Sequence, residues 1–310
     1  MKSTTINSKR SLLEKIRLLP YQEKGAAAIF ILPFMIGFLL LNIFPIIYSF
    51  VISFMDYNTL KPLSEVSFIG FQNYFRIMDD PIALSAFVKS FQYTLVYVPG
   101  VMIFGFLLAL LLNRTFALRG IARTMILMPY VANVVAVALI WSILLNPTNG
   151  PVNQFLSLLG VENLPLWLVG VDTALPTIAL INVWQSLAFQ TIVFLAAIQG
   201  VDKSLYEAAV IDGANKWQKI FHVTLPSISP TTFFLLVTSI IGSFQNYATV
   251  RMLTNGGPGN ASRVISLNIY EEAFALNHYS YASAQAIVLF LIVLVLTIIQ
   301  WKGQKRWVHY

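Results

Sequence analysis

The sequence predicts an all-α, polytopic integral membrane protein, and three observations support this fold class. Of the 310 residues, 57% are hydrophobic and only 11% are charged, whereas about a quarter of the residues of an average soluble domain are charged. The mean hydropathy is +0.72. The charged residues also leave six long uncharged windows, each long enough for a helix to cross the hydrocarbon layer. Membrane β-barrels show closely spaced segments of alternating residues, which these continuous apolar runs do not resemble.

Each of the six windows predicts one transmembrane helix. The third window is longer than the others because it ends in a loop rich in Pro, Asn and Gly between Asn146 and Pro151. Its helix is therefore expected near Met125–Leu145. The other five helices are expected near Ile29–Phe54, Tyr93–Leu112, Leu175–Ile198, Thr232–Tyr247 and Ala282–Gln300.

Positive charge predicts which way the six helices run. An even number of crossings places both termini on one side of the membrane. If that side is the cytoplasm, the inner segments carry 15 of the 20 Lys and Arg residues. Because Lys and Arg accumulate in cytoplasmic segments, both termini are expected to be cytoplasmic. Four basic residues near the N-terminus then fix the topology, namely Lys9, Arg10, Lys15 and Arg17.

The composition excludes several classes of function. The chain has no cysteine, and its three histidines are scattered, so spacing predicts neither a metal site nor a proton relay. It contains no Gly-Lys dipeptide, so it cannot form a P-loop, and no ATP or other cofactor is expected on this chain. Too few charges remain for a nucleic-acid-binding surface. We therefore expect no catalytic residue and no enzymatic activity.

One cytoplasmic segment, Asp202–Pro226, carries a distinctive pattern. Ser204 and Glu207 have the spacing of a capping box, which predicts the start of a helix. Gly213 suits a helix end that needs a positive φ. A second short helix is expected near Lys216–His222, ending before the next proline. Two short helices that project from a bundle could enter a groove on a partner protein.

The spacing of this segment resembles the EAA loop of bacterial ABC-importer permeases. Glu207-Ala208-Ala209 is followed after three residues by Gly213 and, nine residues later, by Val223-x-Leu225-Pro226, where the family prefers Ile in place of Val223. The loop also precedes the penultimate helix, as in that family. The resemblance implies that the loop docks on a separate ATPase subunit. The residues it implicates in coupling are Glu207, Ala208, Ala209, Asp212, Gly213, Leu225 and Pro226.

Two further stretches resemble the carbohydrate-uptake branch of these permeases, of the maltose-transporter large permease and glycerol-3-phosphate permease type. They are Phe68–Tyr74 and Met252–Pro258, and the resemblance extends from about Ile29 to Trp301. It implies a sugar-importing permease in the bacterial cytoplasmic membrane. The implied partners are a second homologous permease, two ATPase subunits that bind ATP-Mg, an extracytoplasmic sugar-binding protein and membrane lipid. The expected domains are a cytoplasmic N-terminal segment (1–25), a permease domain (26–301) that contains the loop, and a cytoplasmic tail (302–310).

The helices that flank the loop carry two polar rows. At 3.6 residues per turn, Asn182, Gln185, Ser186 and Phe189 fall within an arc of about 100°. Ser239, Ser243 and Asn246 follow one face of the next helix, and Tyr247, Phe189 or Trp184 could stack on a sugar ring. The two rows could line one cavity for a neutral mono- or oligosaccharide. They could equally hydrogen-bond the helices to each other.

Two other classes of function stay open at this point. The uncharged windows argue against an ion-coupled carrier, which needs a titrating or ion-binding group within the membrane. They permit a self-sufficient channel or a facilitated-diffusion carrier for a small polar solute, and also a membrane scaffold. Whether the Asp202–Pro226 loop binds an ATPase separates these alternatives. The sequence leaves open which sugar is carried, which permease holds it, whether the pair is a homodimer or a heterodimer, and whether the host has an outer membrane.

Overall fold

A computed structural model describes residues 21–57, 62, 65–114, 117–305 and 308. Within these ranges the secondary structure is helical, apart from one isolated β-bridge between Met55 and Phe68. The chain forms two units, Met1–Ile52 and Ser53–Tyr310, and each is described separately. The basic residues at positions 9, 10, 15 and 17 lie outside the described residues. The prediction of an all-α polytopic protein is confirmed.

The first unit is one long helical segment made of α2 (Tyr21–Phe38), η1 (Leu39–Ile43) and α3 (Phe44–Ile52). Its apolar part, Ala28–Ile52, is long enough to cross a membrane. The element η1 is a π-turn, in which the Phe44 N–H donates to the carbonyl of Leu39, five residues back. This wide turn directly precedes the Phe44-Pro45 dipeptide. It accommodates a residue that has no N–H and that would clash with an ordinary helical turn.

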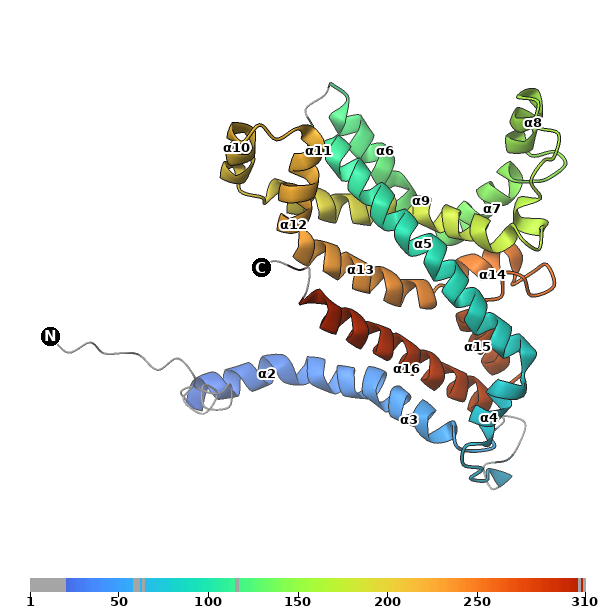
Figure 1. The fold of residues 1–310 in the computed structure, drawn as a ribbon. Coiled ribbons are helices and arrows are strands. Elements are labelled where there is room, and N and C mark those ends of the chain that lie inside the picture. Colours follow the sequence, from blue (N-terminus) through green and yellow to red (C-terminus); the bar gives the residue numbers. More distant parts are fainter. Residues whose placement is uncertain (1–20, 58–61, 63–64, 115–116, 306–307, 309–310) are drawn as a thin grey trace. The chain divides into compact units, whose positions relative to one another are not determined.

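The second unit contains the remaining described helices, among which α13 and α16 lie side by side in Figure 1. Two of them, α5 and α16, are long single helices, and a third, α9, packs along α5. In chain order the helices are α4 (Gln72–Asp79), α5 (Pro81–Asn113), α6 (Arg119–Val131), α7 (Val134–Leu144), α8 (Pro151–Leu158), η3 (Trp167–Val169), α9 (Ala174–Gln199), α10 (Lys203–Ile211), α11 (Lys216–Lys219), η4 (Ile220–Thr224), α12 (Leu225–Ser227), α13 (Ser229–Phe244), α14 (Ala248–Thr254), α15 (Ile265–Phe274) and α16 (Tyr279–Gln304).

Within the described residues, four helices are long and apolar enough to cross a membrane, and two bent helix pairs bring the number to six if each pair is one span. The prediction of a single third helix over Met125–Leu145 is wrong. In its place α6 and α7 meet at 102°. Ala132 and Asn133 adopt extended backbone conformations there, and the Asn133 side chain accepts the N–H of Val135, 2.8 Å away, which starts a new helix.

The second bend, of 71°, lies between the Lys216–Ser227 helical segment and α13. Ile228 leaves the helical conformation, and Pro230 stands in the first turn of α13. The fifth helix, expected near Thr232–Tyr247, therefore begins and ends three residues earlier. Asn246 and Tyr247, which we placed within this helix, follow its end.

The second helix begins twelve residues before the position expected from hydropathy. Asp80 caps α5 by accepting the N–H groups of Ile82 (2.9 Å) and Ala83 (3.2 Å). Pro81 occupies the first helical position, where a backbone N–H would have no partner within the helix, so the absence of an N–H in proline costs no hydrogen bond. The result is a helix of 33 residues.

This long helix contributes to every buried apolar cluster of the second unit. Tyr93 packs with residues of α7, α9 and α14, Phe87 packs with α4, α15 and α16, and Ala109 packs with α9 and α13. Two glycines bring α5 and α9 close together. A Cβ at Gly105 would lie 2.7 Å from the Cβ of Gln190, and one at Gly100 would lie 2.9 Å from a methyl group of Val183.

This close approach predicts a stability effect. The Cβ atom of Gln190 is fixed to the α9 backbone and cannot rotate away, so Gly105→Ala should force the two helices apart. We expect a loss of about 1–3 kcal/mol, as for other overpacked sites, measured as a lower thermal midpoint of the detergent-purified protein. Gly242→Ala in α13 is the control, because nothing lies within 4 Å of its added Cβ. Equal midpoints for the two variants would contradict close packing at Gly105.

Candidate coupling loop and substrate pathway

The first helix of the loop, α10, begins at a different cap from the one expected. The side chain of Asp202, not that of Ser204, accepts a backbone hydrogen bond, from the Ser204 N–H at 2.9 Å. The predicted capping box between Ser204 and Glu207 is therefore wrong. The same bond, with a further one from the Ser204 side chain, lowers the pKa of the Asp202 carboxyl. Asp202 is favoured over Ser204 as the N-cap because its carboxylate is a stronger hydrogen-bond acceptor than a hydroxyl at a helix N-terminus.

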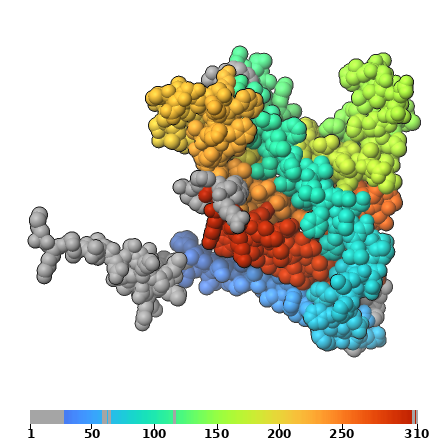
Figure 2. All heavy atoms as spheres, in the orientation of Figure 1, coloured from blue at the N-terminus to red at the C-terminus, as the bar shows by residue number. Residues whose placement is uncertain are grey.

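The helix α10 is largely exposed, and only Tyr206 and Ala209 among its nine residues are half-buried. None of its residues is buried. Glu207 and Ala208 face solvent, and so do the apolar side chains of Val210 and Ile211, with Ile211 86% exposed. In Figure 2 the loop forms a knob on the surface of its unit. Exposed aliphatic side chains around a central carboxylate form a surface suited to burial in a partner.

Gly213 ends α10 as expected, with φ at +76°. The Gly213 N–H donates to the Val210 carbonyl (3.0 Å) and the Ala214 N–H to the Ala209 carbonyl (2.8 Å). An added Cβ would meet nothing within 4 Å. Glycine is thus favoured here by the left-handed backbone and not by lack of space. Asp212, just before it, is exposed.

The second part of the loop is longer than expected. It begins with a capping box between Asn215 and Gln218. We expected a helix that ends before Pro226, but α11, η4 and α12 form one helical segment through Ser227. In η4 the Leu225 N–H donates to the carbonyl of Ile220, five residues back, so a π-turn accommodates Pro226 as it does Pro45. Leu225 and Pro226 are half-buried at the base of the loop.

The two parts of the loop are joined by one side-chain hydrogen bond. The hydroxyl groups of Tyr206 in α10 and Thr224 in η4 lie 3.0 Å apart. Thr224 also donates to the carbonyl of Lys219 at 3.3 Å. This bond connects α10 to the helical segment that leads into α13.

Four of the predicted pathway residues hydrogen-bond neighbouring segments. Asn182 accepts from Thr249 (3.1 Å), Ser239 accepts from Gln190 (2.8 Å), and Asn246 donates to the hydroxyl of Tyr93 (2.7 Å). The hydroxyl of Ser243 lies 2.8 Å from that of Thr94. In this structure the amides and hydroxyls of these four side chains hold helices together.

The other α9 residues of the row lie beside the α6–α7 bend. Gln185 donates to the Ala132 carbonyl at 3.4 Å, which the bend frees from its helix. The ring of Phe189 stacks on Tyr130, with centroids 6.3 Å apart. Both side chains remain partly exposed, as does Ser186, which accepts a bond from Tyr97 (3.0 Å). A freed backbone carbonyl, an amide, a hydroxyl and two rings thus form one uncharged, partly exposed surface.

Tyr247 contacts a different helix, α15. Its ring stacks on Tyr270 of α15, with centroids 4.9 Å apart, and the guanidinium carbon of Arg251 lies 4.3 Å from the Tyr270 ring centroid. A hydrogen bond with Tyr270 raises the pKa of Arg251. Tyr247 therefore belongs to an aromatic and cationic group at the end of α13.

Sequence reasoning missed the polar row of α5. Ser90, Tyr93, Thr94 and Tyr97 follow one face of the helix at i, i+3, i+4 and i+7. Three of them bond the residues predicted on the other helices, and Ser90 accepts the backbone N–H of Ile265 at 2.8 Å. The same periodicity test that selected the rows in the fourth and fifth helices would have found this one.

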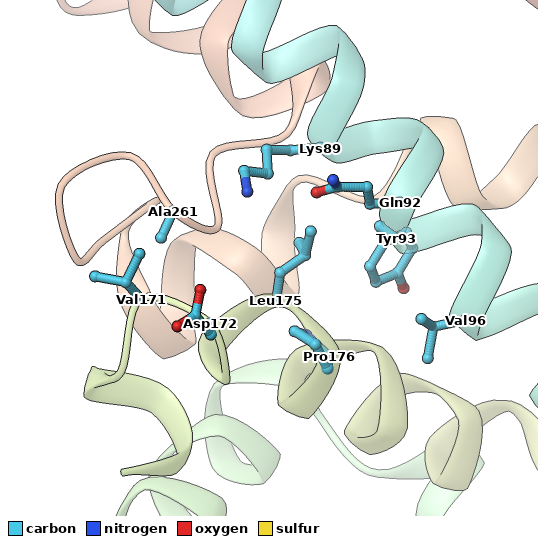
Figure 3. A pocket seen from close by; sticks show the side chains of 9 residues that line it. All are labelled: Lys89, Gln92, Tyr93, Val96, Val171, Asp172, Leu175, Pro176 and Ala261. Atoms are coloured by element: carbon cyan, nitrogen blue, oxygen red, sulfur yellow. The ribbon is translucent and has the colours of Figure 1, made fainter.

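A pocket of about 250 Å³ lies at the end of α5 opposite to the loop. Lys89 and Gln92 of α5 and Asp172, just before α9, direct polar atoms toward it, and Tyr93 is among its lining residues (Figure 3). None of the predicted pathway residues lines this pocket. One of them, Asn246, hydrogen-bonds the hydroxyl of Tyr93, which does line it. Among the described residues, no group of three His, Asp or Glu could hold a metal ion.

Comparisons with known proteins agree with this architecture. Residues 101–306 match the family described as "Binding-protein-dependent transport system inner membrane component". The chain is 32% identical to the probable ABC transporter permease protein YurN of Bacillus subtilis, over 92% of this chain and 97% of YurN. It is also 32% identical to the arabinooligosaccharides transport system permease protein AraP of Halalkalibacterium halodurans, over 90% of this chain and 87% of AraP.

A solved structure supports the same assignment. A chain of the bacterial alginate ABC transporter, in complex with an alginate pentasaccharide-bound periplasmic protein, aligns with a TM-score of 0.81 at 26% identity. The alignment covers 95% of this chain and 97% of that one. The family match covers more than half of the sequence, and the relatives align over nearly their full length. This chain therefore belongs to the family of binding-protein-dependent transport system inner membrane components.

Proposed function

We propose that this chain is a permease subunit of an ABC importer that carries neutral mono- or oligosaccharides across the bacterial cytoplasmic membrane. The similarity to AraP and to the alginate transporter supports a saccharide substrate. The uncharged surface around Gln185 supports a neutral one, because amides and hydroxyls match sugar hydroxyl groups without requiring a counter-ion. The chain itself has no enzymatic activity in this proposal.

The topology we propose has six spans, with each bent helix pair counted as one. Both termini and the α10–α12 loop are then cytoplasmic, which agrees with the distribution of Lys and Arg. The permease domain covers 26–301, between a short cytoplasmic N-terminal segment and tail.

The observation that carries the coupling role is the exposed surface of α10. A short helix that presents Ile211 and Val210 around Glu207 is suited to a groove on an ATPase subunit. The Gly213 turn sets the direction of the next helical segment, and the Tyr206–Thr224 bond links the two. In this proposal the ATPase binds ATP-Mg and moves α10, and the segment through Leu225 and Pro226 transmits that movement to α13.

For the pathway, we propose that sugar passes the surface formed by Gln185, Ser186 and Phe189 at the α6–α7 bend. Broken helices line substrate sites in other transporters because they free backbone groups for hydrogen bonding. Asn182, Ser239, Ser243 and Asn246 support this surface by holding α5, α9, α13 and α14 together. Tyr247 lies nearer the outer end, where it could meet sugar before the others.

The proposed assembly contains a second, homologous permease, two ATPase subunits and an extracytoplasmic sugar-binding protein. Many apolar side chains of α5 and α16 are exposed in the isolated chain, which is expected where lipid and a second permease cover them. The segments Asp56–Lys89 and Arg251–Glu272 would receive the binding protein. Residues 58–61 and 63–64 of the first segment lie outside the described residues.

The coupling role predicts that Glu207→Lys uncouples transport. Reversing the charge at the centre of a docking surface costs about 2 kcal/mol or more, so sugar uptake by the assembled transporter should fall about 30-fold. The chain should still insert, because Glu207 is exposed and is not a helix cap.

The readout is uptake of radiolabelled sugar by proteoliposomes, alongside ATP hydrolysis and co-purification of the ATPase. Glu162→Lys is the matched control, an exposed glutamate outside the loop. Normal uptake by the Glu207→Lys transporter would refute the docking role of α10.

The pathway role predicts that Phe189→Ala raises the KM for sugar uptake. Loss of an aromatic stacking partner is worth about 1 kcal/mol, which corresponds to about a fivefold increase. Phe290→Ala in α16, also exposed, is the control and should leave the KM unchanged. If both variants transport with the wild-type KM, the sugar does not contact Phe189.

A further inference from the structure

An apolar groove of about 390 Å³ lies between α5 and the helical segment at the base of the loop. Met102 and Phe106 of α5 line one side, and Trp217 and Phe221 line the other. The rings of Trp217 and Phe221 stack with centroids 6.4 Å apart and are 67% and 59% exposed. The size and apolar lining suit a flexible hydrocarbon chain.

A second, polar pocket of about 510 Å³ continues from this groove, because Leu110 and Ile220 line both. Arg114, Lys216 and Lys219 line the polar pocket, and no acidic residue does. The three basic side chains come from the end of α5 and from α11, so the fold brings together positions that are more than 100 residues apart in the sequence.

These positive charges are not neutralised by the part of the chain that the structure describes. There, the ion pairs join Arg263 to Glu271 and His278 to Glu272, on other helices. Three like charges around one pocket repel each other, and an anion between them would relieve that repulsion.

An apolar groove that opens into a cluster of basic side chains has the chemistry of a phospholipid site. The headgroup phosphate would meet Arg114, Lys216 and Lys219, and an acyl chain would lie along Trp217 and Phe221. Tryptophan is common at the headgroup level of membranes, and basic pockets between helices on the cytoplasmic side bind anionic headgroups.

We propose that this composite site binds an anionic phospholipid of the cytoplasmic leaflet. The assignment of the site to the cytoplasmic leaflet rests on the proposed function, in which the α10–α12 loop is cytoplasmic. Tyr206 of α10 also lines the polar pocket. The bound lipid therefore touches α5 and both parts of the coupling loop, and it stabilises the loop against the membrane domain.

The test is native mass spectrometry of the full chain, purified with whatever subunits remain bound and titrated with phosphatidylglycerol or phosphatidylcholine. We expect one phosphatidylglycerol to be retained at detergent concentrations that remove phosphatidylcholine. A Lys216→Gln/Lys219→Gln variant should bind phosphatidylglycerol about 30-fold more weakly, at about 1 kcal/mol for each basic side chain near a charged membrane surface. Lys302→Gln, an exposed lysine beyond the site on α16, should bind as the wild type does.

A second measurement identifies what covers the apolar groove. A photo-crosslinking amino acid at position 217 should attach to lipid in native membranes. Attachment to an ATPase or to a second permease would overturn the proposal, because a protein would then occupy the groove. Equal retention of both lipids, or unchanged phosphatidylglycerol binding by the double variant, would overturn it as well.

These outcomes separate the lipid site from the proposed transport function. Lipid retention is measured in the absence of sugar and ATP, and the sugar-uptake assay does not depend on how much lipid is retained. If uptake fails in every preparation while phosphatidylglycerol is still retained selectively, the transport proposal fails alone. If uptake is intact and no lipid is retained, only the lipid site fails.

Discussion

The constraint on which the structure depends is that backbone polar groups in hydrocarbon must find partners within the protein. Straight helices satisfy it alone, but this chain bends two of its membrane segments. At the first bend, Gln185 donates to the freed Ala132 carbonyl and Asn133 caps the next helix. At the second bend, the hydroxyl of Ser229 donates to the Pro226 carbonyl at 2.7 Å. Each departure from a straight helix is thus matched by a polar side chain placed beside it.

The same constraint assigns the polar side chains of the membrane segments to two roles. Asn182 and Ser239 hydrogen-bond α14 and α9, and Ser243 and Asn246 hydrogen-bond the polar row of α5. Gln185 serves a helix bend and remains partly exposed. At such a bend, a transporter can present uncharged polar groups to a sugar while those groups keep hydrogen-bond partners within the protein.

Sequence patterns predicted the features that follow from composition or from one residue's conformational preference. Each of the six uncharged windows coincides with a long apolar helix or a bent helix pair, and Gly213 adopts the positive φ expected of it. The α6–α7 bend was missed because Asn133 lies inside a window whose hydropathy does not fall there. The Asp202 cap was missed because Asp202 and Ser204 both offer a side-chain acceptor for the start of the same helix. The continuous helical path through Pro226 was missed because a π-turn leaves no clear signal in composition. The roles of the loop and pathway residues stay predictions, since they depend on partners outside this chain.

The central claim is that this chain acts as the membrane subunit of an ATP-driven importer and meets its ATPase through the α10–α12 loop. The most direct measurement is to tag the chain in its native host, extract it in mild detergent and identify the co-purifying proteins, with and without residues 203–211. We expect a P-loop ATPase and a second permease with the intact chain, and the permease without the ATPase when α10 is removed. A chain that purifies alone in both forms, yet conducts sugar after reconstitution, would contradict the claim and establish a self-sufficient channel.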